Sequence, residues 1–377
     1  MMQDENTREQ NILLAKTSPS IFLEGKPPVL IDEWQVIPFI WNQIRTEIDR
    51  RNAFGQFILT GSIMPDEKEL EHQHSGTGRI TDLIMRPMTL FESGESDGSV
   101  SLQKLFDGTD VMPTRCGHDL SDYAFYTARG GWPRAIGQPR DIALQQAIDY
   151  YDGLAEAEMS NADGIGREPK RVRRLLRSYA RNCSTQANNS TIKKDMQAND
   201  SGTLDEDTIF SYVTALKRLF VIEESGAWNP NLRSKTAIRT SDTRYFVDPS
   251  IACAALGIGP AGLIGDLRTF GLLFENLCIR DLRVYAERIG GTVKHFRNSA
   301  GLEADAVITL RDGRWAAVEV KLGSSDLIEE GARNLLALKD EAETEKAAAF
   351  LMVLTAGSIA CRRKDGVWVV PLGCLGP

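Results

Sequence analysis

The stretch Val29-Leu30-Ile31-Asp32-Glu33 decides the fold of the N-terminal part of this 377-residue chain. An apolar strand pattern ends directly in two acids, and a second apolar run, Phe57-Ile58-Leu59, follows after a helical pattern over residues 37–49. A strand, a helix and a strand in this order are typical of a βαβ unit, in which the two strands lie parallel. The sequence therefore predicts an α/β fold whose parallel sheet includes these two strands.

Polar side chains follow both predicted strands. Asp32 and Glu33 close the first strand, and Thr60 and Ser62 follow the second. Because parallel strands end at the same edge of a sheet, we expect these side chains to lie together. In P-loop ATPases such acids hold Mg²⁺ (here Asp32) and orient or deprotonate the attacking water (here Glu33), while a nearby hydroxyl senses the γ-phosphate. A structural strand that ends at a polar turn would have the same local sequence.

Composition and charge argue against several classes of protein. The net charge of −8 does not suggest a general nucleic-acid binder. No run approaches the roughly 20 apolar residues that would cross a membrane, and the acidic N-terminus does not resemble a signal peptide. Six scattered cysteines and the pair His72 and His74 lack the spacing of a zinc site, so free thiols and solvated loop histidines are expected. These features predict a cytoplasmic protein with no membrane segment.

The middle region, residues 119–248, is predicted to be mostly helical. Its clearest helix covers residues 205–220, and residues 227–244 have the composition of a hairpin or wing, which together suggest a winged-helix-like unit. A basic run from Arg167 to Arg181 is predicted to be helical. Two interpretations of this run stay open: a solvated helix face, or a surface that contacts phosphates of a nucleic acid.

The last region, residues 249–377, is predicted to be α/β. A helix over 270–289 precedes two alternating strands, 304–310 and 315–321, which flank the hairpin signal Arg311-Asp312-Gly313-Arg314. A helix over 328–338, a strand over 348–354 and a hairpin near residues 364–366 follow.

The strongest chemical signal in this region is Asp305, followed by Glu319 and Lys321 on the next strand. Restriction-endonuclease-like enzymes bind Mg²⁺ through such carboxylates, with a lysine near the attacking water or the phosphate. Glu275, on the preceding helix, is a candidate for a third acid. A structural sheet face with a Glu319–Lys321 salt bridge is the simpler alternative.

The hairpin register distinguishes these alternatives. A two-residue turn at Asp312-Gly313 would place Asp305 opposite Val320, facing away from Glu319. A three-residue loop with a glycine bulge would place Asp305 opposite Glu319 on the same face, as a metal site requires.

Several further motifs carry a resemblance to a known family. Leu59-Thr60-Gly61-Ser62, then Ser75-Gly76-Thr77-Gly78-Arg79, then Pro87 with Glu92 occur in this order. With the Ile-Asp-Glu strand they resemble the prokaryotic AAA-type ATPases that carry a C-terminal nuclease-like domain of unknown function. Arg129-Gly130-Gly131-Trp132-Pro133 resembles the element that follows the ATPase core in that family. The family's arginine motif has leucine where this chain has Gly76.

The resemblance implies domains at residues 1–118 (truncated AAA-type ATPase core), 119–248 (helical and winged-helix-like) and 249–377 (nuclease-like). It implies Mg²⁺ and ATP as cofactors. Asp32 would hold Mg²⁺, Glu33 would act on water, Thr60 and Ser62 would sense nucleotide, and Arg79 would face phosphate.

Relatives also carry the phosphate-binding Walker A loop GxxxxGKS/T, which the 377 residues lack. We therefore expect an N-terminally truncated chain that binds ATP weakly or not at all and whose N-terminal region is incompletely packed.

The leading hypothesis is an ATP-driven switch. The alternative is a Mg²⁺-dependent nuclease, or a nucleic-acid-binding module, that uses Asp305, Glu319 and Lys321. The third hypothesis is that the chain is a non-catalytic interaction protein. Nucleic acid is a candidate partner of the basic 167–181 helix or of the C-terminal domain, and a homo-oligomer is compatible with the AAA resemblance.

Overall fold

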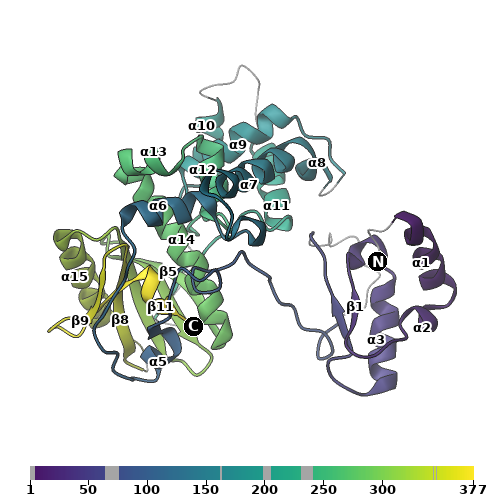
Figure 1. Ribbon diagram of the computed structural model, residues 1–377, viewed down its shortest axis with the longest axis horizontal. Coiled ribbons are helices and arrows are strands. Elements are labelled where there is room, and N and C mark those ends of the chain that lie inside the picture. Colours follow the sequence, from purple (N-terminus) through teal and green to yellow (C-terminus); the bar gives the residue numbers. More distant parts are fainter. Residues whose placement is uncertain are drawn as a thin grey trace. The chain divides into compact units, whose positions relative to one another are not determined.

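The computed structural model describes residues 5–63, 76–161, 164–197, 205–230, 241–342, 344 and 346–377. The chain forms two compact units. The first contains Met1–Met85, Ser160–Ile165 and Thr214–Phe220, and the second contains Arg86–Met159, Gly166–Val213 and Val221–Pro377. The predicted mixed α/β class is confirmed (Figure 1).

Among the described residues of its N-terminal segment, the first unit contains a small parallel sheet and three helices. The two strands, β1 (Val29–Ile31) and β2 (Phe57–Leu59), pair in parallel with Leu30 opposite Ile58. The helices are α1 (Glu5–Thr17), α2 (Pro19–Phe22) and α3 (Ile40–Arg51). Helix α3 starts three residues later than predicted, because Trp34–Val36 forms a 3-10 turn and Pro38 precedes the helix. The predicted βαβ unit is thus confirmed.

One face of this sheet is packed and the other is open. Ile31 packs with Leu23, Ile40 and Ile44 in a common core. The neighbouring Leu30 and Ile58 point the other way and remain 57% and 49% exposed. A two-stranded sheet is only marginally stable by itself, so an open apolar face is a surface that a further element could cover.

The second unit begins well before the predicted domain boundary at residue 118. Strand β3 (Val100–Ser101) pairs with the last strand, β11 (Leu375–Gly376), and β4 (Thr114–Arg115) joins the large sheet through β9. Helix α5 (Leu102–Phe106) packs on β8. The structure therefore divides the chain after residue 85, because short strands between residues 100 and 115 pair with strands more than 200 residues away.

The middle of the chain is helical, as predicted. The helices are α6 (Leu120–Arg129), α7 (Arg140–Gly153), α8 (Met159–Asn161), α9 (Pro169–Arg181), α10 (Asn189–Gln197), α11 (Glu206–Arg218), α12 (Pro249–Leu256) and α13 (Pro260–Gly265). After α11 the chain forms antiparallel bridges between Ile222 and Phe246 and between Ser225 and Thr243. The tip of the predicted wing, residues 231–240, lies outside the described residues, as do His72, His74 and Ser75.

A seven-stranded mixed sheet forms the C-terminal part, in the order β4-β9-β10-β8-β7-β6-β5. Its main strands are β5 (Gly291–Arg297), β6 (Glu303–Leu310), β7 (Trp315–Lys321), β8 (Ala348–Thr355), β9 (Ile359–Arg362) and β10 (Trp368–Pro371). Strand β8 runs parallel to β7 and β10, and the other described pairings are antiparallel. Helix α14 (Leu267–Arg288) packs on β5, β6 and β7, and α15 (Ser325–Glu341) packs on β6, β7 and β8.

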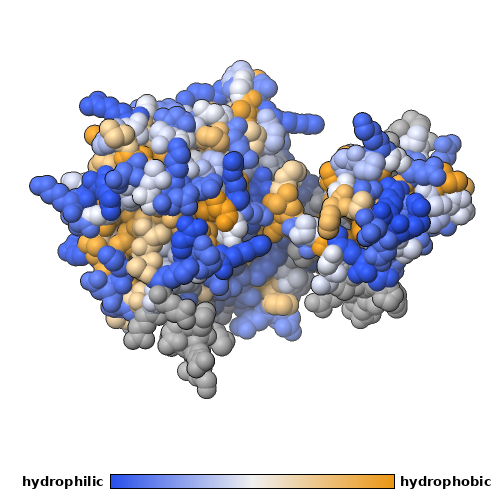
Figure 2. All heavy atoms as spheres, turned by 90° about the horizontal axis from the view of Figure 1, so that it is seen from below, coloured by the Kyte–Doolittle hydropathy of each residue, from blue (hydrophilic) through white to orange (hydrophobic). Residues whose placement is uncertain are grey.

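The face of the molecule shown in Figure 2 is mainly hydrophilic, with separate apolar patches. Within the described residues, no helix is both long enough and apolar enough to cross a membrane.

Candidate functional site

The four polar residues predicted at the edge of the N-terminal sheet do meet. The Thr60 hydroxyl donates to Asp32 Oδ1 over 2.6 Å, and the Ser62 hydroxyl donates to Glu33 Oε2 over 3.2 Å. Backbone bonds from Thr60 N to Ile31 O and from Trp34 N to Thr60 O hold the two strand ends together. The parallel pairing of β1 and β2 is the reason for this meeting, because it carries both strand ends to one edge.

Glu33 has a backbone conformation that non-glycine residues seldom adopt. Its φ is +53°, in the left-handed region, and such conformations gather at functional sites. Its carboxylate also accepts a hydrogen bond from the Gln35 amide. Gly61 lies close to this side chain: a Cβ there would lie 2.5 Å from Gln35 Oε1, so the Gln35 side chain would have to move to accept one.

A cavity of about 320 Å³ lies beside this edge, and its lining runs along β1 to Asp32. It includes Phe22, Gly25 and Lys26. Arg79, predicted to face phosphate, instead pairs with Asp49 on α3, with Nε 2.6 Å from Oδ1. The structure thus brings Asp32, Glu33, Thr60 and Ser62 together, while Arg79 is engaged by another acid.

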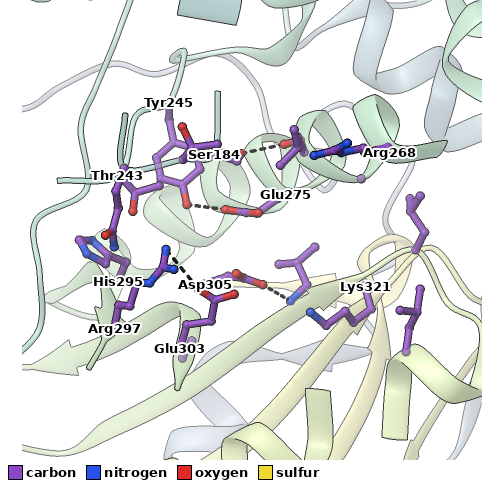
Figure 3. A pocket seen from close by; sticks show the side chains of 18 of the residues that line it. Ser184, Thr243, Tyr245, Arg268, Glu275, His295, Arg297, Glu303, Asp305 and Lys321 are labelled. Carbon is purple, nitrogen blue, oxygen red and sulfur yellow. Dashed lines mark hydrogen bonds and ion pairs between the residues drawn. The ribbon is translucent and has the colours of Figure 1, made fainter. Parts of the chain in front are cut away.

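A second cavity, of about 340 Å³, lies at the carboxyl end of β7 in the second unit (Figure 3). Asp305 on β6, Lys321 on β7 and Glu275 on α14 all line it. The first turns of α14 and α15 supply Arg268 and Leu327. Three of the four predicted C-terminal site residues therefore line one cavity, and the fourth, Glu319, lies near Lys321 on the same strand.

The hairpin between β6 and β7 has the register that a metal site requires. Thr309 pairs with Trp315 and Ala306 with Val318, so the next pair in line is Asp305 with Glu319. The loop is Arg311-Asp312-Gly313, closed by a bond from Leu310 N to Arg314 O, with Gly313 at φ +85°. The structure thus has the three-residue loop, the second of the two predicted alternatives, and Gly313 supplies the positive φ that this loop needs. In addition, Asp305 Oδ2 accepts a hydrogen bond of 2.7 Å from Val320 N.

Glu319 is fully buried, and its charge is compensated by Lys321. The side chain is 1% exposed, and the Lys321 ammonium lies 3.0 Å from Oε2. Burial, and then repulsion from Asp305, raises the pKa of Glu319 to about 9. Burial by itself would lower the pKa of Lys321, but the carboxylates of Glu319 and Asp305 outweigh it and raise that pKa. The pair is therefore an ammonium beside a carboxyl group that resists ionisation.

The pKa values of Asp305 and Glu275 are raised as well. Burial raises the pKa of Asp305, although Lys321 works in the opposite direction. Burial, and then the charge of Asp305, raises the pKa of Glu275 well above its usual range. Three carboxyl groups with raised pKa values and one lysine form a site whose negative charge exceeds its positive charge when the acids ionise.

The donor set fits a divalent cation. Within the described part of the chain, the carboxylate oxygens of Glu319 accept no hydrogen bond of regular geometry, and Oε2 has the ion-pair contact with Lys321 instead, which is unusual for a buried acid. Carboxylate oxygens are the ligands that Mg²⁺ prefers. Among the described residues, however, no three His, Cys, Asp or Glu side chains are gathered closely enough to hold one ion between them. A cation held by Asp305 and its neighbours would thus take further ligands from water and phosphate oxygens, as Mg²⁺ commonly does.

Two residues near this cavity were missed by sequence reasoning. Tyr245, from the middle region, lines the cavity and donates a hydrogen bond to Glu275. Gly331 on α15 faces the site from the other helix, because a Cβ there would lie 3.3 Å from Glu319 Cβ and 3.5 Å from Lys321 Cε. Neither residue belongs to a local motif, and only the fold brings them to the site.

Part of the positive charge of the basic run 167–181, which includes helix α9, is neutralised by neighbouring acids. Arg173 pairs with Asp152 and, over 2.8 Å, with Glu156. Arg181 lies 2.8 Å from Asp195, and Arg167 is buried. Arg177 is exposed. Much of the positive charge that suggested contact with phosphates is thus directed toward neighbouring elements.

Three family models match the chain. Residues 2–93 match an AAA domain, residues 120–262 match a domain of unknown function (DUF8612), and residues 270–375 match a second domain of unknown function (DUF4143). The N-terminal segment thus supports an AAA-type ATPase family. No match was found among curated proteins or among solved structures. The first match covers Asp32, Glu33, Thr60 and Ser62, and the third covers Glu275, Asp305, Glu319 and Lys321.

Proposed function

We propose that residues 2–93 form the Mg²⁺- and water-facing side of an AAA-type ATPase site, and that the protein acts as an ATP-driven switch. The observation that carries this proposal is the 2.6 Å bond from Thr60 to Asp32 at the end of two parallel strands, within the segment that matches an AAA domain. When bound, Mg²⁺ would neutralise charge on the phosphates. Asp32 and Thr60 would position its water shell, and Glu33 would orient the attacking water.

Under this proposal, the 377-residue chain binds ATP only weakly. The 377 residues contain no GxxxxGKS/T loop, whose backbone N–H groups and lysine supply most phosphate contacts in such sites. The open face at Leu30 and Ile58 fits a sheet that takes a further element. In the resembling family that element carries the loop.

The test is a fluorescence titration of the full chain with a labelled ATP analogue, with and without Mg²⁺. We expect Mg²⁺-dependent binding in the millimolar range that Asp32→Asn weakens about tenfold, a loss of about 1.4 kcal/mol. Asp49→Asn, which removes an acid outside the site, is the matched control. Binding that does not respond to Mg²⁺ or to Asp32→Asn would reject the proposal.

The C-terminal cavity supports a second function, Mg²⁺-dependent cleavage of nucleic acid in a nuclease-like domain. The observation that favours it is the register that aligns Asp305 with Glu319, next to Lys321 and across a cavity from Glu275. When bound, Mg²⁺ would polarise a phosphoryl oxygen and a water molecule. The carboxylates would hold it, and the Lys321 ammonium would lie near charge that develops on the phosphate.

Cleavage assays on labelled single- and double-stranded DNA and RNA, with Mn²⁺ or Mg²⁺, test this second function. We expect metal-dependent products that disappear with Lys321→Ala. Products that persist in that variant would show a contaminating nuclease and contradict the assignment.

The middle region remains part of both proposals. A winged-helix-like unit with a basic α9 would guide nucleic acid toward the cavity, with exposed Arg177 as its first candidate contact. A homo-oligomer would suit an AAA-type switch, in which a neighbouring subunit commonly supplies an arginine.

A further inference from the structure

We propose that Tyr245 is a positioning residue that fixes the carboxylate of Glu275 in the C-terminal cavity, so that the middle region completes the metal site. This inference rests on the proposed divalent-cation site. It goes beyond that site because Tyr245 lies in the segment matched by DUF8612, whereas the acids and Lys321 lie in the segment matched by DUF4143.

The contact itself is short and enclosed. The Tyr245 hydroxyl donates to Glu275 Oε1 over 2.7 Å, and Tyr245 is fully buried. Both side chains line the cavity, with the tyrosine ring above the carboxylate and Asp305 on the opposite wall (Figure 3). One oxygen of Glu275 is thus held from the middle region, while the carboxylate faces the space that contains Asp305.

The backbone next to Tyr245 is anchored to the same helix. The buried Asn276 side chain accepts a bond from Phe246 N over 3.0 Å and donates to Phe246 O over 2.8 Å. Adjacent residues on one segment (Tyr245, Phe246) therefore bind adjacent residues on α14 (Glu275, Asn276). This double attachment fixes the tyrosine relative to the helix, so the hydroxyl reaches Glu275 from a defined direction.

The ring of Tyr245 also contacts a cation. The Arg283 guanidinium lies 5.4 Å from the centre of the Tyr245 ring, a cation–π contact. Arg283 also lies 3.3 Å from Glu223 Oε2, and Glu223 N bonds to Tyr245 O over 3.0 Å. Ring, backbone and hydroxyl of Tyr245 are all constrained, which is what a group that orients a metal ligand requires.

A purely structural role makes a different prediction. A buried tyrosine hydroxyl needs some partner, and in that case Glu275 would merely satisfy Tyr245. Removal of the hydroxyl would then alter stability without altering metal affinity. A positioning role predicts the reverse: affinity for the cation falls, because Glu275 is no longer held, while the shape of the buried ring is kept. Loss of a group that orients a metal ligand commonly costs about 10–100-fold in metal affinity.

The experiment is a calorimetric titration of the full chain with Mn²⁺, accompanied by thermal unfolding without metal. The variants are Tyr245→Phe, Asp305→Asn and, as matched control, Tyr285→Phe, which removes another buried hydroxyl of the same unit that does not line the cavity. We expect Tyr245→Phe to weaken Mn²⁺ binding at least tenfold, Asp305→Asn to abolish it, and Tyr285→Phe to leave it unchanged. In cleavage assays the Mn²⁺ concentration for half-maximal rate should rise in Tyr245→Phe, at an unchanged KM for nucleic acid.

The outcomes distinguish the existence of the metal site from the positioning role of Tyr245. If Asp305→Asn abolishes Mn²⁺ binding but Tyr245→Phe binds like the wild type, the positioning role is overturned and the metal site stands. If the wild type does not bind Mn²⁺, or if Asp305→Asn binds it equally well, the metal site and the positioning role both fall. A shift in unfolding temperature for Tyr245→Phe with unchanged Mn²⁺ affinity would assign a structural role.

Discussion

Two strands of this protein carry an acid at or near their carboxyl ends, and the surroundings of those acids differ. Asp32 follows a strand of a two-stranded sheet and accepts a hydrogen bond from the exposed Thr60 hydroxyl. Glu319 lies in the middle of a seven-stranded sheet, is fully buried, and has Lys321 beside it. Asp32 accepts its hydrogen bond from a neutral hydroxyl near solvent. Glu319 is buried, and burial disfavours the ionised form of its carboxyl group.

The difference shows what burial does to the same chemical group. A carboxylate near water can be ionised at little cost, whereas a buried carboxyl group either keeps its proton or needs a compensating positive charge. The C-terminal site should therefore respond strongly to loss of its lysine, to pH and to packing, and the N-terminal site should respond weakly. The following predictions test this ranking, starting with the largest effect.

The largest effect is expected from Lys321→Ala. Removal of the ammonium leaves Asp305 and Glu319 without their cation and leaves phosphate charge unopposed, so metal-dependent cleavage should fall by about 10²–10³-fold. Initial rates on labelled DNA measure this. Lys346→Ala, an exposed lysine that does not line the cavity, should retain the rate, as should Asp32→Asn. An equal loss in Asp32→Asn would show that the two sites are coupled.

A pH effect on stability should come next. The folded pKa of Glu319, about 9, lies above the ordinary value of 4.5, so the folded state binds this proton more tightly than the unfolded state. Stability without metal should therefore fall as pH rises from about 4.5 toward 9, by at most about 1.4 kcal/mol per pH unit. Urea denaturation between pH 5 and 9 measures it. Glu319→Gln should flatten the dependence, whereas Glu303→Gln, an exposed acid on the same strand as Asp305, should not.

A packing effect of intermediate size is expected from Gly331→Val. The added side chain would press on Glu319 and Lys321 and should lower the free energy of unfolding by about 1–3 kcal/mol. Urea denaturation gives the value. Gly153→Val is the matched control, because nothing lies within 4 Å of a Cβ at that helical glycine. Equal effects of the two changes would mean that α15 can move away from the sheet without cost.

The smallest effect should come from Thr60→Val in the N-terminal unit. It removes the 2.6 Å bond to Asp32, but both groups can turn to water, so the free energy of unfolding should fall by less than about 1 kcal/mol. Ser62→Ala, with its longer 3.2 Å contact, should have a smaller effect still. A loss as large as that of Gly331→Val would show that this edge is more buried in solution than its exposure suggests.

Much of the secondary structure could be predicted from the sequence. Strands β1, β2, β6, β7 and β8 lie where apolar runs or alternating patterns placed them, because such patterns reflect which faces of a strand are buried. The glycine loop between β6 and β7 was also among the predicted alternatives, since Gly313 permits the positive φ that the three-residue loop requires. Strands β3 and β4 were missed, because two-residue strands carry no pattern of their own.

The sequence by itself determined which residues carry the chemistry: the acids after β1, the hydroxyls after β2, and Asp305, Glu319 and Lys321 along one hairpin. Local spacing is enough for these, because parallel strands end together and a hairpin aligns its two strands. Only the tertiary structure decided the Arg79 pairing with Asp49, the close approach of Gly331 and the bond from Tyr245 to Glu275. These contacts join segments about 10 to 30 residues apart, and their geometry follows from how helices pack against loops and strands, which no short stretch of sequence specifies.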